Sequence, residues 1–294
     1  MARAGLSVRR GLVAFGLVAL LGVVLVELRE ESDSRPAAAP GHWRPLEPGL
    51  ELAALHAPVE SELGDSLIRV LRIDPEHFDL RLLNASARDD GELRTAREWA
   101  REYGLVAAIN ASMFQTDYRS SVSLMINRAH VNNPRLSKDN TVLAFDRRDA
   151  GAPRAQIIDR ACQDFDSLRE SYRVLVQSIR MISCEGRNVW AEQSRKWSTA
   201  AIGVDDEGRV LFIHSRSPYS VHDLIDMLLA LPLSLRNAMY VEGGREAQLY
   251  VHTAGEELEF YGSVEMGFLD ADANRVAWPI PNAIGVARRE SAGR

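Results

Sequence analysis

The sequence predicts an α+β fold, a mixed and mainly β-sheet core with a few packed helices, in a single domain behind an N-terminal membrane segment. Short apolar or alternating runs recur between turn signals through the body of the chain, whereas only two stretches have helical spacing. An apolar run near the N-terminus is preceded by arginines and followed by acidic residues. Hydrophobic residues make up 46% of the chain, which is ample for one core.

Residues 1–30 are expected to form a signal anchor or a signal peptide. The apolar run 11–28 is close to the length that a membrane-spanning helix needs, and Arg9 and Arg10 stand directly before it. No small-residue cleavage site follows at once, which favours an anchor in the inner membrane with a periplasmic domain; secretion to the periplasm is the alternative. Residues 31–50, which lack periodicity, are predicted to be a linker, and 51–290 the folded domain.

The strands of this domain are predicted from alternating or apolar runs bounded by turn residues. Residues 200–204 and 209–214 are expected to form a hairpin, because Gly208 supplies a turn between them. The other predicted strands are 66–73, 78–83, 105–109, 122–126, 141–145, 173–177 and 278–286.

Two helices are predicted. The first spans 95–103, with Thr95 as its cap and Gly104 as its stop. The second spans 220–231, where Ser220 caps the helix and Asp223 stands at the capping-box position, before Pro232 ends it.

The stretch from Ala238 to Val251 is the most informative part of the chain. It places Glu242, Gly243, Gly244, Arg245 and Glu246 between two runs that are typical of buried strands. Ligand-binding groups tend to lie on loops held by a rigid scaffold, so these residues are a candidate site. A charged hairpin turn is the alternative interpretation.

Cys162 and Cys184 are the only cysteines, and neither belongs to a Cys-x-x-Cys pair, so no zinc site is predicted. Outside the cytoplasm they are expected to form a disulfide; two buried thiols are the alternative.

The chain contains five motifs in this order: Ala108–Phe114, Val176–Ser178, Thr199–Asp205, Ser217–Leu224 and Val241–Gly244. Together they resemble the phosphodiester glycosidase family, the uncovering-enzyme-like domain, and its bacterial periplasmic branch in particular. The resemblance covers roughly Ser66 to Val286. Two of the motifs depart from the family pattern: Ile179 replaces a glycine after the second, and Glu242 replaces an aspartate in the last, which also lacks a third glycine and two serines.

The resemblance implies a site where the ends of these strands meet. Glycosidic cleavage commonly uses two carboxylates, so Glu242 and Glu246 are catalytic candidates. Asn110 is the third candidate, because it stands at the end of a predicted strand that leads to the same site. Glu242 is expected to be the essential carboxylate, and the two glycines after it to leave room for a substrate. Arg180 and Arg195 are candidates for binding a phosphate oxygen. The substrate-binding candidates are Ser178, Arg180, Arg195, Thr199, Gly243, Gly244 and Arg245.

Two functions remain open on the sequence. One is an extracytoplasmic hydrolase of a sugar-1-phosphodiester or a related envelope glycan, such as an exopolysaccharide. The other is a non-catalytic envelope protein that binds a glycan in a degenerate site. The expected partners are a carbohydrate or sugar-phosphate ligand and the inner membrane through residues 11–28. No cofactor is expected, and the net charge of −6 gives no general attraction to nucleic acid.

Overall fold

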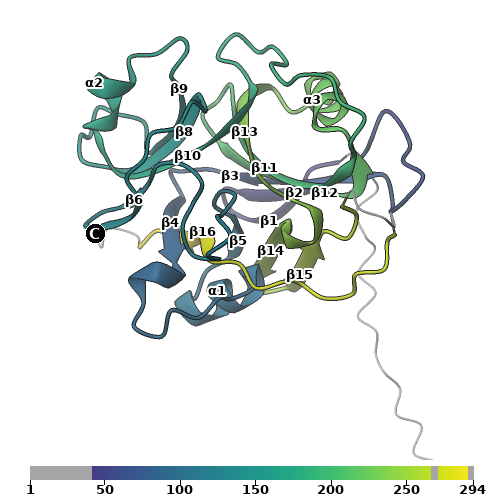
Figure 1. Ribbon diagram of the computed structural model, residues 1–294, viewed down its shortest axis with the longest axis horizontal. Coiled ribbons are helices and arrows are strands. Elements are labelled where there is room, and N and C mark those ends of the chain that lie inside the picture. The colour runs from purple at the N-terminus through teal and green to yellow at the C-terminus, as the bar shows by residue number, and fades with distance from the viewer. Residues whose placement is uncertain (1–41, 266–270, 291–294) are drawn as a thin grey trace, which may run out of the picture. The chain divides into compact units, whose positions relative to one another are not determined.

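The computed structural model describes residues 42–265 and 271–290. Two antiparallel sheets pack face to face, and short helices cover their outer sides (Figure 1). The strands of the 11-stranded sheet are β1 (Arg44–Glu47), β2 (Leu50–His56), β3 (Leu67–Ile73), β6 (Met125–Asn127), β7 (His130–Asn133), β8 (Thr141–Arg147), β9 (Ala155–Asp159), β10 (Tyr172–Ile182), β11 (Trp197–Asp205), β12 (Val210–Tyr219) and β13 (Leu235–Gly243). The strands of the 5-stranded sheet are β4 (Phe78–Asn84), β5 (Ala107–Asn110), β14 (Gln248–Thr253), β15 (Glu256–Tyr261) and β16 (Asn282–Arg288).

The strand order decides which side chains can meet. The large sheet runs β1-β2-β3-β12-β11-β13-β10-β6-β7, with β8 and β9 attached through β10. The small sheet runs β15-β14-β5-β16-β4. Strand β13 therefore lies between β11 and β10, and its register sets Thr199 opposite Gly243 and Ala200 opposite Glu242. The candidate carboxylate thus stands in the interior of the large sheet, at the end of one of its central strands.

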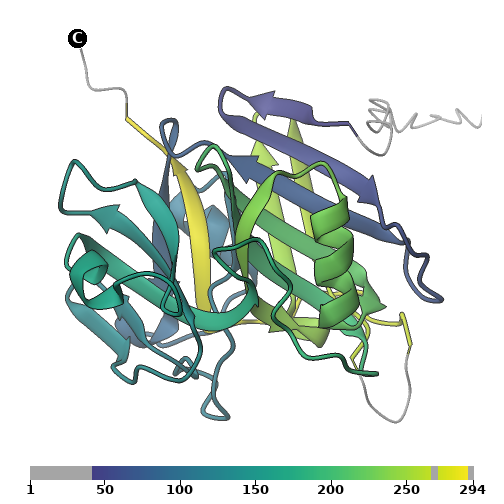
Figure 2. The same ribbon diagram turned by 90° about the horizontal axis from the view of Figure 1, so that it is seen from above.

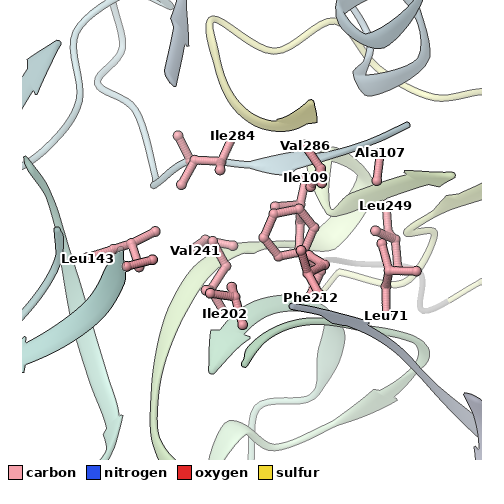
Figure 3. Close-up of a cluster of buried hydrophobic side chains, with 14 of the residues drawn as sticks. Leu71, Ala107, Ile109, Leu143, Ile202, Phe212, Val241, Leu249, Ile284 and Val286 are labelled. Carbon is pink, nitrogen blue, oxygen red and sulfur yellow. The ribbon is translucent and has the colours of Figure 1, made fainter. Parts of the chain in front are cut away.

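The main core fills the space between the two sheets (Figure 3). Ile109, Leu249 and Ile284 of the small sheet point towards side chains of the large sheet that include Ile202 and Phe212. These residues alternate with outward-facing ones along their strands, which is why the sequence shows period-two patterns. The core holds the ends of β5 and β13 in fixed positions relative to each other.

The α-helices of residues 42–265 and 271–290 cover the outer faces of the sheets (Figure 2). Helix α1 (Ala96–Tyr103) packs on the small sheet; Thr95 forms a full capping box with Glu98, and Gly104 ends the helix in the left-handed conformation. Helix α3 (Val221–Ala230) packs on the large sheet, and α2 (Phe165–Arg169) packs beside β9 and β10.

Both predicted helices are confirmed, but the second differs in two details. Ser220 caps α3 by accepting a hydrogen bond from the Asp223 backbone, whereas the Asp223 side chain does not return a bond to the cap. Leu229, which the helical spacing of the apolar residues in this segment would place on the buried face, is 37% exposed.

Several strand boundaries also differ from the prediction. Strand β1 begins at Arg44, inside the segment 31–50 that was expected to be a linker. The closing strand β16 begins at Asn282 rather than at 278, because two prolines precede it and each lacks a backbone donor. Within 122–126 only the last two residues are in a strand.

No helix among residues 42–265 and 271–290 combines the length and apolar character needed to cross a bilayer. The predicted membrane segment, 11–28, lies outside the described residues.

The structure joins Cys162 to Cys184, with 6.8 Å between their Cα atoms. Replacing both cysteines with serine is expected to lower the free energy of unfolding by about 3 kcal/mol, because a cross-link between residues 22 apart restricts the unfolded chain. Urea unfolding measures this loss. Dithiothreitol should lower the stability of the wild type to that of the variant and leave the variant unchanged; a wild type insensitive to the reductant would contradict the expectation.

Candidate functional site

The end of β5, the middle of β10, which continues to Ile182, and the last part of β13 meet in one hydrogen-bonded cluster. Ser112, just past the end of β5, donates to the Gln177 carbonyl oxygen over 3.1 Å. Ser178 is fully buried, and its hydroxyl donates to the carbonyl oxygen of Tyr240. Asn110 at the end of β5 and Glu242 on β13 belong to the same region. The predicted strand-end residues are therefore close in space.

Glu242 lies in surroundings that favour its neutral form. Its side chain is mostly buried, and burial raises the pKa of its carboxyl to about 8; the nearby charge of Glu246 acts in the same direction. The Gly243 amide donates to one carboxyl oxygen over 3.0 Å, which opposes the rise. Glu242 therefore carries a proton at neutral pH and can give it to a leaving group.

Glu246 belongs to a short 3₁₀ turn, η2 (Gly244–Glu246), that directly follows β13. Gly244 starts the turn with φ of +64°, a conformation that favours glycine. Burial raises the pKa of the Glu246 carboxyl, and Glu265 adds to the rise while Arg245 opposes it. The site thus holds two carboxyl groups, and the charge of Glu246 adds to the rise in the pKa of Glu242.

Asn110 holds this turn in place. Its amide nitrogen donates to the carbonyl oxygen of Glu246 over 2.8 Å, and its amide oxygen accepts from the Gln248 backbone over 2.7 Å. The side chain is 1% exposed. Asn110 therefore connects the small sheet to the carboxylate-bearing turn.

The room beside the two glycines is occupied by the protein itself. A Cβ atom on Gly243 would lie 2.1 Å from the Tyr240 hydroxyl and 2.6 Å from the Trp197 ring. On Gly244 it would lie 3.1 Å from the Glu265 side chain. The glycines were expected to leave room for a substrate; instead they allow Tyr240, Trp197 and Glu265 to close around the end of β13.

The candidate arginines differ in their surroundings. Arg180 donates to both carboxylate oxygens of Asp159 over 3.0 and 3.1 Å, and Asp159 is fully buried. Asp159 also accepts from the Cys184 backbone, so the disulfide adjoins this ion pair. Arg245 pairs with Glu265 over 2.8 Å. Its guanidinium also stacks over Trp278.

Arg195 is exposed and has no ion-pair partner among residues 42–265 and 271–290. It lies on the loop that leads to Trp197. Thr199 is buried opposite Gly243, and its hydroxyl lies 3.5 Å from the carbonyl oxygen of Trp197. Of the predicted cationic residues, Arg195 is therefore the one free to move towards a ligand.

Two aromatic residues of the site were not predicted. Tyr240 precedes Glu242 by two residues on β13, and the nearby charge of Glu242 adds to the rise that burial causes in the Tyr240 pKa. The pairing of β13 with β11 shifts by one residue between Tyr240 and Glu242, so the spacing in the sequence alone could not place the two side chains together. Trp197 begins β11 and reaches Gly243 across the sheet. Only the β11–β13 register reveals this contact.

The fully buried His214 is also close to the turn. Its Nε2 lies 3.3 Å from the Ala247 carbonyl oxygen, which requires the proton on that nitrogen. Burial, with Arg69 nearby, lowers the pKa of His214 to about 3, so the ring is neutral. It serves as a hydrogen-bond donor beneath the turn.

Because the pKa of Glu242 is raised in the folded protein, the free energy of unfolding is expected to depend on pH. Its folded-state pKa lies above the ordinary 4.5, so the folded protein binds a proton that the unfolded chain releases between these values. The stabilisation that comes from this bound proton is fully present below pH 4.5 and is lost as the pH rises towards 8. Urea unfolding from pH 5 to 8.5 should show a decline on the order of 2–3 kcal/mol that Glu242→Gln removes. If the free energies of unfolding of the wild type and of Glu242→Gln changed with pH in the same way, Glu242 would not be the source of the decline.

The family model described as phosphodiester glycosidase matches residues 103–287. The catalytic domain of a zebrafish N-acetylglucosamine-1-phosphodiester alpha-N-acetylglucosaminidase, auto-inhibited by its pro-peptide, has a similar structure. The TM-score is 0.60 at 14% identity, and the match covers 86% of this chain and 87% of that one. A hypothetical protein from Synechocystis gives a TM-score of 0.58 at 15% identity over 86% of this chain and 64% of that one.

At these identities the two structures show a shared fold. No curated protein matches the sequence. The family match spans more than half of the chain and includes the ends of β5, β10 and β13 and the turn after β13. This protein belongs to the phosphodiester glycosidase family.

Proposed function

We propose that this protein hydrolyses a sugar-1-phosphodiester, with Glu242 as the acid and Glu246 as its carboxylate partner. The observation that carries the proposal is the buried Glu242 carboxyl, with its pKa raised to about 8 beside a second carboxyl group. Glycosidases need one protonated and one ionised carboxyl group at neutral pH. The environments of Glu242 and Glu246 differ in burial, and the less buried Glu246 takes the ionised role.

In the proposed reaction, water is added across the bond between the sugar C1 and the bridging phosphate oxygen. That bond breaks and its electron pair stays on the phosphate oxygen, which receives the Glu242 proton. Glu246 accepts a proton from the water whose oxygen becomes bonded to C1. The products are a free sugar and a phosphate monoester.

The other residues have supporting roles in this proposal. Asn110 fixes the turn that carries Glu246, through the two hydrogen bonds that it makes there. Arg195, which has no carboxylate partner in the part of the chain that the structure describes, binds the phosphate, whereas Arg180 keeps its ion pair with Asp159.

The proposed place of action is the cell envelope, with the domain anchored by residues 11–28 and an envelope glycan as substrate. The Arg-flanked apolar run and the cysteine pair support this placement. Inner-membrane fractionation, with protease access from the periplasmic side, tests the anchor; a soluble mature chain beginning near Pro40 would overturn it.

A second function, non-catalytic glycan binding, is favoured by one observation. Tyr240 and Trp197 fill the space beside Gly243, where a substrate was expected. The two functions are separated by incubating the purified protein with N-acetylglucosamine-1-phosphodiesters and other sugar-1-phosphodiesters and measuring free sugar. Release of sugar supports the hydrolase. Binding of glycan without release from any of them supports the binding protein.

A further inference from the structure

A groove of about 680 Å³ opens between helix α3 and the segment 58–63. That volume is within the range of small-molecule sites, about 300–1,000 Å³. Its apolar lining includes Pro58, Val59, Leu63, Pro218, Tyr219 and Met227.

The groove adjoins the candidate active site on two sides. Lys196 lines it and precedes Trp197, whose ring lies against Gly243. Val264 also lines it and precedes Glu265, whose side chain lies against Gly244. A substrate held at Glu242 could therefore extend past these residues into the groove.

The charged residues that line the groove carry both signs. Its acidic residues are Glu60, Glu62, Asp223 and Asp226. Asp226 accepts from Asn188 over 2.8 Å and faces His222 over 3.4 Å, but the other three carboxylates have no ion-pair partner among the described residues.

On the side towards the active site, Lys196 lines the groove and exposed Arg195 precedes it. Neither cation has an ion-pair partner in the described part of the chain. Lys196 thus places a cation at the segment that leads to Trp197, while the carboxylates lie on the segment 58–63 and on α3, whose Asp223 and Asp226 also face residues 192–194.

We infer that the groove receives an aminoalkyl group attached to the phosphate of the substrate, so that the substrate is a sugar-1-phosphodiester of an amino alcohol. This inference rests on the proposed function. A phosphodiester alone would be repelled by Glu60, Glu62 and Asp223. An ammonium group a few atoms beyond the phosphate reverses that interaction, because the phosphate meets Lys196 and the ammonium meets the carboxylates and the Tyr219 ring.

The test compares two synthetic substrates that differ in one group: N-acetylglucosamine-1-phosphoethanolamine and the matching 2-hydroxyethyl phosphodiester. The KM for the ethanolamine compound should be about tenfold lower. Asp223→Asn combined with Glu60→Gln should remove this difference, because it raises the KM for the ethanolamine compound and lowers the KM for the hydroxyethyl compound, which these two carboxylates repel. Asp206→Asn, an exposed carboxylate on the β11–β12 turn with a 71% exposed side chain, is the matched control and should preserve it.

Equal KM values for the two compounds in the wild type would overturn the inference while leaving the hydrolase function intact. Calorimetric titration with phosphoethanolamine and with 2-hydroxyethyl phosphate gives a readout that does not need catalysis. Tighter binding of phosphoethanolamine that the double variant abolishes supports the groove assignment, even if no phosphodiester is cleaved. Equal binding of both phosphates would count against it.

Discussion

Replacing Glu242 with glutamine is expected to lower kcat/KM for a sugar-1-phosphodiester by about a thousandfold without lowering the melting temperature. Glutamine has the shape of the neutral carboxyl group and keeps an oxygen that can accept from the Gly243 amide. It cannot deliver a proton to the leaving oxygen. The variant should therefore retain the fold and lose the chemistry, as sugar-release assays and thermal unfolding at pH 5 would show.

Glu170→Gln is the control for this substitution, because the Glu170 side chain is 80% exposed and lies on the surface after α2. It should leave both activity and melting temperature unchanged. Full activity in Glu242→Gln would remove Glu242 from the mechanism. A large fall in melting temperature would instead assign Glu242 a structural role.

The second large effect is expected for Gly262→Ala, which should cost about 3 kcal/mol of folding stability and most of the activity. A Cβ atom there would lie 1.9 Å from the carbonyl oxygen of Gly244 and 2.9 Å from the Ser198 side chain. The first neighbour is backbone in the turn that carries Glu246, so it cannot rotate away. Relief of the clash must displace this turn, and with it the second carboxyl group.

Gly151→Ala is the matched control, because its nearest neighbour would be an Asp149 side-chain atom at 3.4 Å. Urea unfolding and sugar-release assays should show little change for this variant. If Gly262→Ala proved as stable and active as Gly151→Ala, the packing of Gly262 against the turn would not position Glu246.

The sequence predicted those elements whose signals are local. Helix α1 has its cap at Thr95 and its stop at Gly104, and both act within the helix itself. Strand β15 was missed because its glutamates make the segment resemble a solvated loop. Their partners come from elsewhere in the chain: Glu256 pairs with Arg44, and Glu257 with Arg101. Within β15, Leu258 and Phe260 alternate with Glu257 and Glu259 and pack against the main core. This alternation is short, so the acidic residues dominate the sequence pattern.

In the candidate site, too, the sequence could place some residues and could not reveal the contacts of others. Asn110, Ser178 and Glu242 could be placed together because each is at or near a predicted strand end and the family resemblance ordered those strands. The partners of Arg180 and Gly243 could not be predicted. Asp159 reaches Arg180 from β9, which the sequence did not reveal, and Trp197 reaches Gly243 only through the sheet register.

The position of β16 in the small sheet has a consequence for how the chain folds during synthesis. This last strand lies between β4 and β5, and it pairs Phe78 with Arg288, roughly 200 residues apart. Until it arrives, β4 has no neighbour in its sheet and one face of the core stays uncovered. Closure of such a distant pair is slow, so the nascent domain must wait, incompletely folded, for its final strand. A folding helper that shields β4 and β5 during that interval would raise the yield of native protein.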